Sequence, residues 1–164
     1  MGRYRAPAPP KAPYITPAGY DVLVQEMKDI WVRRREVTAA LAAAAAEGDR
    51  SENAEYIYRK RELAGIDRRI RYLQVRMPTL KVIRQAPAEP KQIFFAAWVE
   101  LLDENQQRHE YRLVGPDEID QHDAYISIDS PLAKALMKKS VDDEVTVVTP
   151  EATITYLVQS VRYQ

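Results

Sequence analysis

The chain has 164 residues, with no cysteine and with 24 basic and 24 acidic side chains, so its formal net charge is zero. The lack of cysteine excludes disulfides and thiolate metal sites, and no apolar run reaches the roughly 20 residues that a membrane-spanning helix needs. The amino-terminal residues are charged and proline-rich where a signal peptide would be apolar. We therefore expect a soluble, cytoplasmic protein without membrane contact, long enough for one ordinary domain or two small ones.

The zero net charge hides an uneven distribution along the chain. Residues 1–80 contain 15 basic and 10 acidic side chains, a net of +5, whereas residues 81–164 contain 9 and 14, a net of −5. A basic half joined to an acidic half suits a protein with two different partners, for example nucleic acid and a basic protein surface. An ordinary solvated helical surface explains the same charges equally well.

The first 13 residues form a segment with its own composition. They contain four prolines, three basic residues and no acid, so they cannot supply one face of a core. We expect an extended or disordered tail here. An inert tail is favoured over one that contacts phosphates.

Two long segments show a heptad pattern, and they flank a short polar stretch at residues 48–56. Apolar side chains recur in both at alternating spacings of three and four, and one arginine interrupts each series. The first series is Tyr20, Leu23, Met27, Ile30, Arg34, Val37, Leu41 and Ala44, and the second is Tyr56, Arg59, Leu63, Ile66, Ile70, Leu73, Met77 and Leu80. Two such seams joined by a glycine-containing turn predict an antiparallel coiled-coil hairpin with a polar, acidic tip.

Local signals predict where the two helices begin and end. Thr16 can cap the first helix, and Pro17 fits its first position. Gly48 is placed to end this helix, of about 30 residues, in a left-handed conformation, and Pro78 ends the second. Residues 39–46 are almost all alanine, which favours helix and keeps the arms thin near the tip.

The two acids of the tip allow two interpretations. Asp49 can cap the second helix while Glu52, three residues later, completes a capping box. The same carboxylates are also the kind of ligand that Mg²⁺ prefers. From the local sequence alone, capping is the favoured interpretation.

From residue 91 onwards the pattern changes from helical to alternating. It predicts strands at 93–102, 108–114, 125–128, 145–149 and 153–161, a turn at 103–107 and a helix at 132–139. Ser130 and Pro131 supply the cap and the first position of that helix. We expect a small antiparallel sheet crossed by one short helix, so the whole chain has an α+β fold.

No self-contained catalytic constellation is visible in the sequence. His109 and His122 are isolated from each other and from acids at ligand spacing, so a zinc site is not indicated. The five glycines are scattered, which excludes a glycine-rich phosphate loop. Trp31 and Trp98 are expected to be packing residues rather than ligand platforms.

Four separated motifs nevertheless resemble one known family. They are GDRSENAEY (48–56), IDRRIRYL (66–73), FFAAWVEL (94–101) and YISIDSPLAKAL (125–136). In this order they closely resemble the Gre family of bacterial transcript cleavage factors. The second and fourth motifs are more similar to the GreB members than to the GreA members. The resemblance covers about residues 14–164, so only the proline-rich tail lies outside it.

The resemblance implies a domain organisation and a set of partners. It implies a tail at 1–13, a coiled-coil hairpin with an acidic tip at 14–80, and a globular domain like that of the FKBP proteins at 81–164. By resemblance, the globular domain docks on RNA polymerase and the hairpin enters the secondary channel, where its tip meets the nascent RNA 3′ end. The factor is expected to act as a monomer, and it stimulates cleavage by the polymerase rather than cleaving alone.

The resemblance also implies roles for individual residues. Asp49 and Glu52 would hold Mg²⁺ in a site shared with the polymerase. The remaining roles fall on three sets of residues. Arg50, Ser51 and Asn53 would position the tip or the substrate, Arg59, Lys60 and Arg61 would contact RNA, and Asp129, Pro131 and Leu132 would dock on the polymerase.

Simple chemistry agrees with so small a site. Two exposed carboxylates bind Mg²⁺ weakly by themselves, but they can complete a site for a second ion about 3.5 to 4 Å from one that the polymerase already holds. One departure from the family pattern concerns residues 39–46, where GreB-type arms usually carry basic side chains. Two other functions stay open: a channel-binding protein that modulates transcription without cleavage, and a prolyl isomerase suggested only by the second domain's fold.

Overall fold

The computed structural model describes residues 6–48 and 53–164. The chain divides into two compact units, a helical unit of residues 20–80 and a globular unit of residues 81–164 together with the chain up to residue 19. None of the helices in the described part of the chain is long and apolar enough to cross a membrane.

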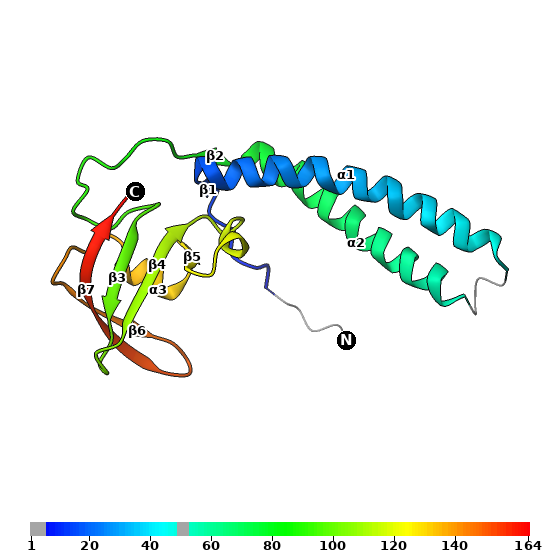
Figure 1. Ribbon diagram of the computed structural model, residues 1–164. Coiled ribbons are helices and arrows are strands. Elements are labelled where there is room, and N and C mark those ends of the chain that lie inside the picture. Colours follow the sequence, from blue (N-terminus) through cyan, green and yellow to red (C-terminus); the bar gives the residue numbers. More distant parts are fainter. Residues whose placement is uncertain (1–5, 49–52) are drawn as a thin grey trace. The chain divides into compact units, whose positions relative to one another are not determined.

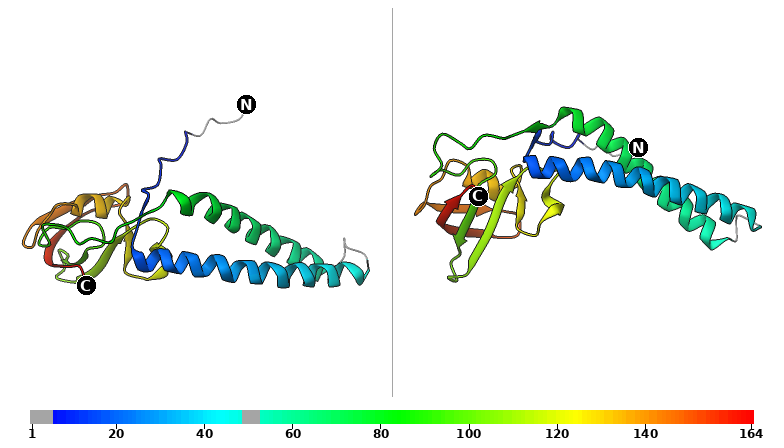
Figure 2. Two further views of the ribbon diagram at one scale, coloured as in Figure 1. Left: turned by 90° about the horizontal axis from the view of Figure 1, so that it is seen from above. Right: turned by 45° about the horizontal axis from the view of Figure 1, so that its top comes forward.

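The helical unit is a hairpin of two long helices. Helix α1 (Pro17–Ala46) continues into it from the globular unit, and α2 (Ala54–Arg76) returns alongside, followed by a 3-10 turn, η1 (Met77–Thr79). The two helices lie next to each other in every view (Figures 1 and 2). Both predicted helices are confirmed, and α1 ends one residue before the expected position.

The predicted heptad seam is the buried interface of the hairpin. Its five fully buried members are Leu23, Val37, Ala44, Ile70 and Leu73, which expose between 0 and 5 % of their surface. All the other seam residues are partly buried. Burial of apolar surface along this line holds the helices together, because neither helix could bury its apolar stripe alone.

The globular unit is built on a five-stranded sheet. Its strands are β3 (Trp98–Leu102), β4 (Arg108–Val114), β5 (Tyr125–Ser127), β6 (Glu144–Val148) and β7 (Thr153–Arg162), in the order β5-β4-β3-β7-β6. The central strands run side by side in Figure 1. The predicted α+β fold class is confirmed.

The sheet is mixed rather than purely antiparallel. Strands β3, β4, β6 and β7 form antiparallel pairs, but β4 and β5 pair in parallel, with Leu113 opposite Ile126. The segment between them contains the 3-10 turn η2 (Ile119–Gln121) and brings the chain back to the end where β4 began. A tight hairpin turn cannot make such a return, because parallel neighbours need a longer crossover.

The core of this unit lies on one face of the sheet, under the short helix α3 (Pro131–Leu136). Leu136 and Ala133 from α3 are fully buried together with alternate residues of the strands, such as Val99, Leu101 and Val158. Ser130 caps α3 by accepting a hydrogen bond from the backbone amide of Ala133 at 3.2 Å. The predicted cap is confirmed.

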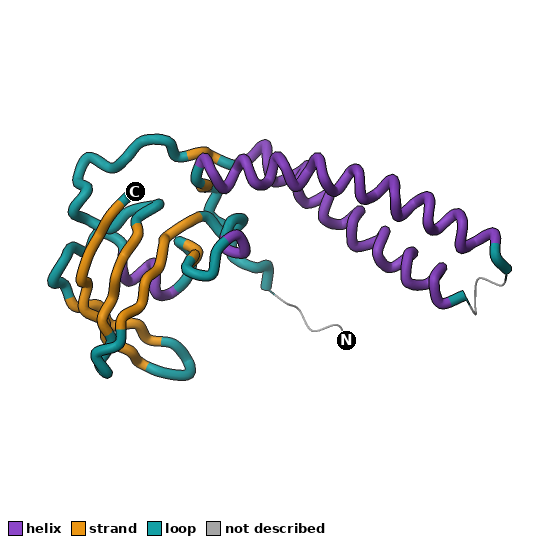
Figure 3. Tube along the Cα trace, viewed as in Figure 1, coloured by secondary structure: helices purple, strands orange, loops and turns teal. Residues whose placement is uncertain are grey.

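In the globular unit, two element boundaries differ from the sequence prediction by more than one residue. The strand expected at 93–102 begins only at Trp98, because Ala96 has a φ of 70° and the backbone of Ile93 bonds to residues 138 and 139 instead. The helix expected at 132–139 ends at Leu136, since Lys138 has a φ of 67°. The stretch from β2 (Lys81–Val82) to β3 is a long loop (Figure 3).

The start of the chain is fastened to the globular unit. Strand β1 (Tyr14–Ile15) pairs in parallel with β2, and the backbone amide of Ala12 donates to Asp129 Oδ2 at 2.9 Å. Pro13 also accepts a backbone hydrogen bond from Lys81, so the last two residues of the proline-rich segment bond to the globular unit.

A buried carboxylate holds the beginning of α1. Glu118 is completely buried, and its Oε2 accepts hydrogen bonds from the backbone amides of Thr16 at 2.8 Å and Gly115 at 3.1 Å. The Thr16 hydroxyl donates to Glu118 Oε1 and accepts from the Gly19 amide at 3.0 Å, which confirms Thr16 as the cap. A Cβ on Gly19 would lie 2.3 Å from Glu118 Oε1.

Candidate functional site

The tip of the hairpin is delimited by Gly48 on one side and Asn53 on the other. Gly48 has a φ of 136°, a conformation that favours glycine, and α2 begins directly after Asn53. The positive φ expected at Gly48 is confirmed. The four predicted tip residues between them, Asp49, Arg50, Ser51 and Glu52, lie outside the described residues.

Asn53 connects the two arms at the base of the tip. Its Oδ1 accepts a hydrogen bond from the backbone amide of Tyr56 at 3.0 Å, and its Nδ2 donates to the backbone carbonyl of Ala44, in the last turn of α1, at 2.7 Å. Only a side chain with both an acceptor and a donor can make these two bonds. A single amide therefore caps α2 and ties it to α1.

This geometry corrects the capping prediction. The N-cap of α2 is Asn53, not Asp49, and the helix begins four residues after the position that an Asp49 cap requires. The interpretation of Asp49 and Glu52 as a capping box is wrong for this reason.

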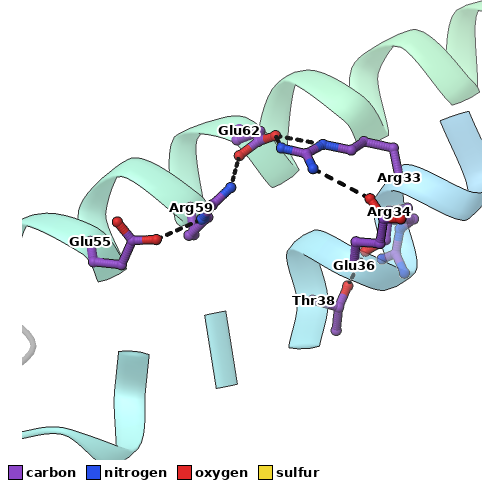
Figure 4. Close-up of polar contacts among 7 residues, drawn as sticks. All are labelled: Arg33, Arg34, Glu36, Thr38, Glu55, Arg59 and Glu62. Carbon is purple, nitrogen blue, oxygen red and sulfur yellow. Dashed lines mark hydrogen bonds and ion pairs between the residues drawn. The ribbon is translucent and has the colours of Figure 1, made fainter. Parts of the chain in front are cut away.

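Arg59, which was expected to contact RNA, is engaged in ion pairs within the hairpin. Its Nε lies 2.8 Å from Glu55 Oε1, and its Nη1 lies 2.9 Å from Glu62 Oε2. Glu62 also accepts hydrogen bonds from Arg33 on α1 at 2.5 and 3.0 Å, so it lies between two guanidinium groups (Figure 4). These arginines, Arg33 first, lower the pKa of Glu62.

Further ion pairs hold the arms farther from the tip. Arg34 Nε lies 2.7 Å from Asp67 Oδ1, and Arg69 binds the carboxylate of Glu26 at 2.9 Å. Arg34 and Arg59 are the two arginines that interrupt the apolar seams. Their role is to pair with acids of the hairpin, which explains why charged residues stand in seam positions.

The other two predicted RNA-contacting residues remain exposed. Lys60 and Arg61 point away from the seam, and within residues 6–48 and 53–164 neither makes an ion pair. The cationic surface closest to the tip on α2 is therefore supplied by these two side chains. The spacing of Arg59 from Glu55 and Glu62, four and three residues, is the sequence signal that could have predicted its pairing.

The three predicted docking residues lie where β5 leads into α3. Pro131 occupies the first position of α3, and Leu132 packs partly buried against the core. Asp129 is partly buried, and its backbone amide donates to Ser127 Oγ at 3.1 Å, while its Oδ2 accepts from the Ala12 amide. The structure thus brings the three residues together and adds the amino-terminal segment to them.

The surroundings of His109 and Trp31 differ from those that the sequence indicated. His109 is not isolated from acids, since its Nε2 lies 2.8 Å from Asp103 Oδ2 and lowers the pKa of that carboxyl. Trp98 packs between Arg112 and Arg162 of the neighbouring strands, with ring distances of 5.7 and 4.9 Å. Trp31 is 39 % exposed, so the packing role expected for it is not met.

No group of three or more potential metal ligands occurs among the residues that the structure describes. The Asp103–His109 pair alone is too few ligands for a zinc site. The carboxylates of the tip, which fall outside that search, stay the candidates for a divalent cation.

Comparison with known proteins identifies the family. A family model for the amino-terminal domain of a transcription elongation factor matches residues 13–82, and a GreA/GreB carboxyl-terminal model matches residues 87–163. The chain is 53 % identical to the transcription elongation factor GreB of Xanthomonas axonopodis pv. citri, over 99 % of this chain and 98 % of that protein. The chain belongs to the GreA/GreB family.

Two further relatives complete the comparison. The GreB factor of Pseudomonas aeruginosa is 49 % identical to this Gre-family chain and covers 99 % of it, with 98 % of that protein aligned. Among solved structures, the GreA factor homolog Gfh1 of Thermus thermophilus is 25 % identical, with a TM-score of 0.42, over 91 % of this chain and 97 % of that one. The resemblance to the GreB branch, drawn from the four sequence motifs, is confirmed, and the Gre-family chain is a transcription elongation factor.

Proposed function

We propose that this Gre-family factor binds bacterial RNA polymerase in the cytoplasm and stimulates the polymerase's own cleavage of the RNA 3′ end in backtracked complexes. The factor has no cleavage activity alone, and it acts as a monomer. The observation that carries the proposal is the position of Asp49 and Glu52 in the sequence, between Gly48, which follows α1, and Asn53, which caps α2.

The carboxylates of Asp49 and Glu52 are the proposed ligands of a shared Mg²⁺ ion. Both are hard oxygen donors, which fit Mg²⁺, and two of them are too few to hold it tightly without further ligands from the polymerase. When bound, the ion would lower the pKa of a water molecule and stabilise charge on the phosphate. The chain's own contribution is to place both carboxylates directly before Asn53, which caps α2 and bonds to the last turn of α1.

Asn53 acts as a positioning residue in this proposal. Its two hydrogen bonds tie the start of α2 to the last turn of α1. A chain segment whose two ends are held loses less conformational entropy on binding an ion than a segment whose ends are free. Arg50 and Ser51 are proposed to complete the contacts of the tip with the substrate.

The RNA 3′ segment is proposed to follow α2 along Lys60 and Arg61. Both are exposed cations with no ion pair in the described part of the chain, and phosphates attract such groups over several ångströms. Arg59 is proposed to contribute less than the sequence suggested, since Glu55 and Glu62 already neutralise its charge. Residues 39–46, being nearly all alanine, add no charge on the other arm.

Docking on the polymerase is proposed to involve Asp129, Pro131 and Leu132. These residues share one short segment held by the Ser130 cap and by core packing of Leu132. A rigid segment binds with little loss of conformational freedom. The partner surface should offer a hydrogen-bond donor or a cation for the Asp129 carboxylate.

The direct test is cleavage by stalled transcription complexes in the presence of Mg²⁺. Asp49→Asn and Glu52→Gln should each abolish stimulation while polymerase binding stays near that of the wild type. Glu47→Gln is the matched control, because Glu47 is an exposed acid directly after α1 and close to the tip, and this variant should cleave normally. Full cleavage by both tip variants would contradict the shared-metal proposal.

The same experiment distinguishes cleavage stimulation from the alternative function, which is channel binding without cleavage. A factor that only occupies the channel would compete with other channel-binding proteins and change elongation, yet release no RNA fragment at any concentration. In that case the tip variants would behave like the wild type in every assay.

A further inference from the structure

The outer face of α2 carries an apolar strip with arginines on its edges, far from the tip and unused by the proposed cleavage function. The strip consists of Arg68, Arg71, Tyr72, Val75, Arg76 and Thr79, which line one surface depression. These residues recur at spacings of three and four, so they share one helix face. The seam residues Ile70 and Leu73 occupy the opposite face, against α1.

The centre of the strip exposes apolar surface to solvent. Val75 is 70 % exposed, among the largest values for apolar side chains in the described residues. Tyr72 lies one turn before it, and the Arg69 guanidinium sits 5.4 Å from the centroid of the Tyr72 ring. A contact with an apolar group would remove the Val75 side chain from water, which is favourable.

The charge around this centre is positive and largely uncompensated. Between positions 68 and 88 the sequence has six basic residues and no acid. Arg68 and Arg71 make no ion pair with any residue that the structure describes. This contrasts with Arg33, Arg34, Arg59 and Arg69, each of which binds a carboxylate of the hairpin.

We propose that this strip, Arg68 to Thr79, is a second docking surface for RNA polymerase and binds an acidic polymerase segment that places an apolar side chain over Val75. The inference rests on the proposed function for the identity of the partner. The acidic character follows from the guanidiniums of Arg68 and Arg71, a type of group that binds carboxylates in a bidentate manner. The apolar anchor follows from the exposed Val75.

A nucleic acid fits the strip less well than a protein segment. Phosphates would satisfy the arginines, but a phosphodiester backbone has no apolar group to cover Val75. The Arg69 guanidinium already lies against the Tyr72 ring, on which a base would have to stack. Cations flanking a small apolar centre are instead typical of protein interfaces, where arginine and aromatic residues are enriched.

The position of the strip along the hairpin agrees with an outer contact. Val75 lies 21 residues after Ala54, so it is about 30 Å from the start of α2 along the helix axis. When the tip reaches the active site through a channel, the strip is left near the entrance. The segment that it binds should accordingly lie on the outer surface of the polymerase.

The test measures binding of the full-length factor to the core RNA polymerase of Pseudomonas aeruginosa, whose GreB is 49 % identical to this chain. Val75→Glu and Arg71→Glu should each weaken binding about tenfold, and Val75→Ala about threefold. Arg35→Glu is the control, since Arg35 is an exposed arginine on α1 without an ion pair among the described residues. It should stay within about twofold of the wild type.

Two further measurements make the outcome decisive. At saturating factor, all these variants should cleave RNA as fast as the wild type, because the strip contributes to binding and not to the tip. Equal polymerase affinity of Val75→Glu and wild type would overturn the second docking surface while leaving the proposed function intact. A loss confined to binding of labelled single-stranded RNA or duplex DNA would overturn it in favour of nucleic acid. A wild-type factor that does not bind polymerase would overturn both.

Discussion

Replacing Asn53 tests whether the tip is held by a single side chain. In Asn53→Ala both hydrogen bonds disappear, the one from the Tyr56 amide at 3.0 Å and the one to the Ala44 carbonyl at 2.7 Å. Loss of an N-cap costs about 1 kcal/mol, and loss of a second hydrogen bond about as much. The free energy that holds the start of α2 against the last turn of α1 should therefore fall by about 2 kcal/mol in this variant.

Asn53→Asp separates the two bonds. Aspartate is as good an N-cap as asparagine, so the bond from Tyr56 is kept. The carboxylate cannot donate to the Ala44 carbonyl, and two acceptors then face each other. Only the connection between the arms is lost, at a cost of about 1 kcal/mol or more.

Hydrogen exchange and cleavage read the two effects separately. Exchange of the Tyr56 amide should accelerate in Asn53→Ala and remain slow in Asn53→Asp. Cleavage in stalled complexes at saturating factor should fall in both variants, by up to about tenfold for each 1.4 kcal/mol lost from the productive tip. Asn105→Ala, in an exposed turn of the globular unit, is the control and should change neither.

The role assigned to Asn53 would be refuted by a specific pair of results. Wild-type cleavage by Asn53→Asp would mean that the bond to Ala44 contributes nothing to the tip. Unchanged exchange of Tyr56 in Asn53→Ala would mean that the cap is not formed in solution. A general loss of helix content in circular dichroism would point to unfolding of the hairpin rather than opening of the tip.

Three other changes follow from buried or paired groups. Glu118→Ala should lower the free energy of unfolding in urea by about 3 kcal/mol, because it leaves the buried amide and hydroxyl of Thr16 without their acceptor. Tyr163→Phe should lower it by about 1 to 2 kcal/mol, since the hydroxyl bonds to the backbone of two residues in the long loop. Glu62→Gln should reduce the acid sensitivity of the hairpin. The pKa of Glu62 is lowered by Arg33, so its contribution to stability is complete above about pH 4.5 and is lost as the pH falls below that value.

The checks on these three predictions differ. Glu151→Gln, an exposed acid in a turn, should leave urea unfolding unchanged, and an equally stable Glu118→Ala would contradict the buried role of that carboxylate. For Tyr163 the contrary result is an unfolding curve identical to that of the wild type. For Glu62 it is a melting temperature that drops equally in the variant and the wild type between pH 5 and pH 3.

Much of the fold was predictable because its signals are local. The apolar spacing of three and four marked the seam, and its members are the buried residues of the hairpin, Val37 and Leu73 among them. Helix caps are also local. Ser130 accepts a hydrogen bond from the amide of Ala133, which is only three positions away in the sequence. Periodicity and capping depend on neighbours in the chain, so they can be read without the tertiary structure.

Other features depend on residues that only folding brings together. The apolar run at 93–97 looked like strand, yet Ile93 bonds to residues 138 and 139. Arg34 interrupts the apolar seam of α1, and its partner Asp67 lies on the other helix. The partners in both cases are more than 25 positions away, beyond the reach of any local pattern.

The tip combines both kinds of information. Heptad spacing and a glycine were enough to predict that two helices are joined by a short acidic segment. That Asn53, rather than Asp49, caps the second helix could not be predicted, because the choice depends on where the carbonyl of Ala44 lies once the arms have packed. A candidate N-cap can be recognised within one segment of the sequence, but the Ala44 carbonyl that Asn53 binds belongs to the other helix.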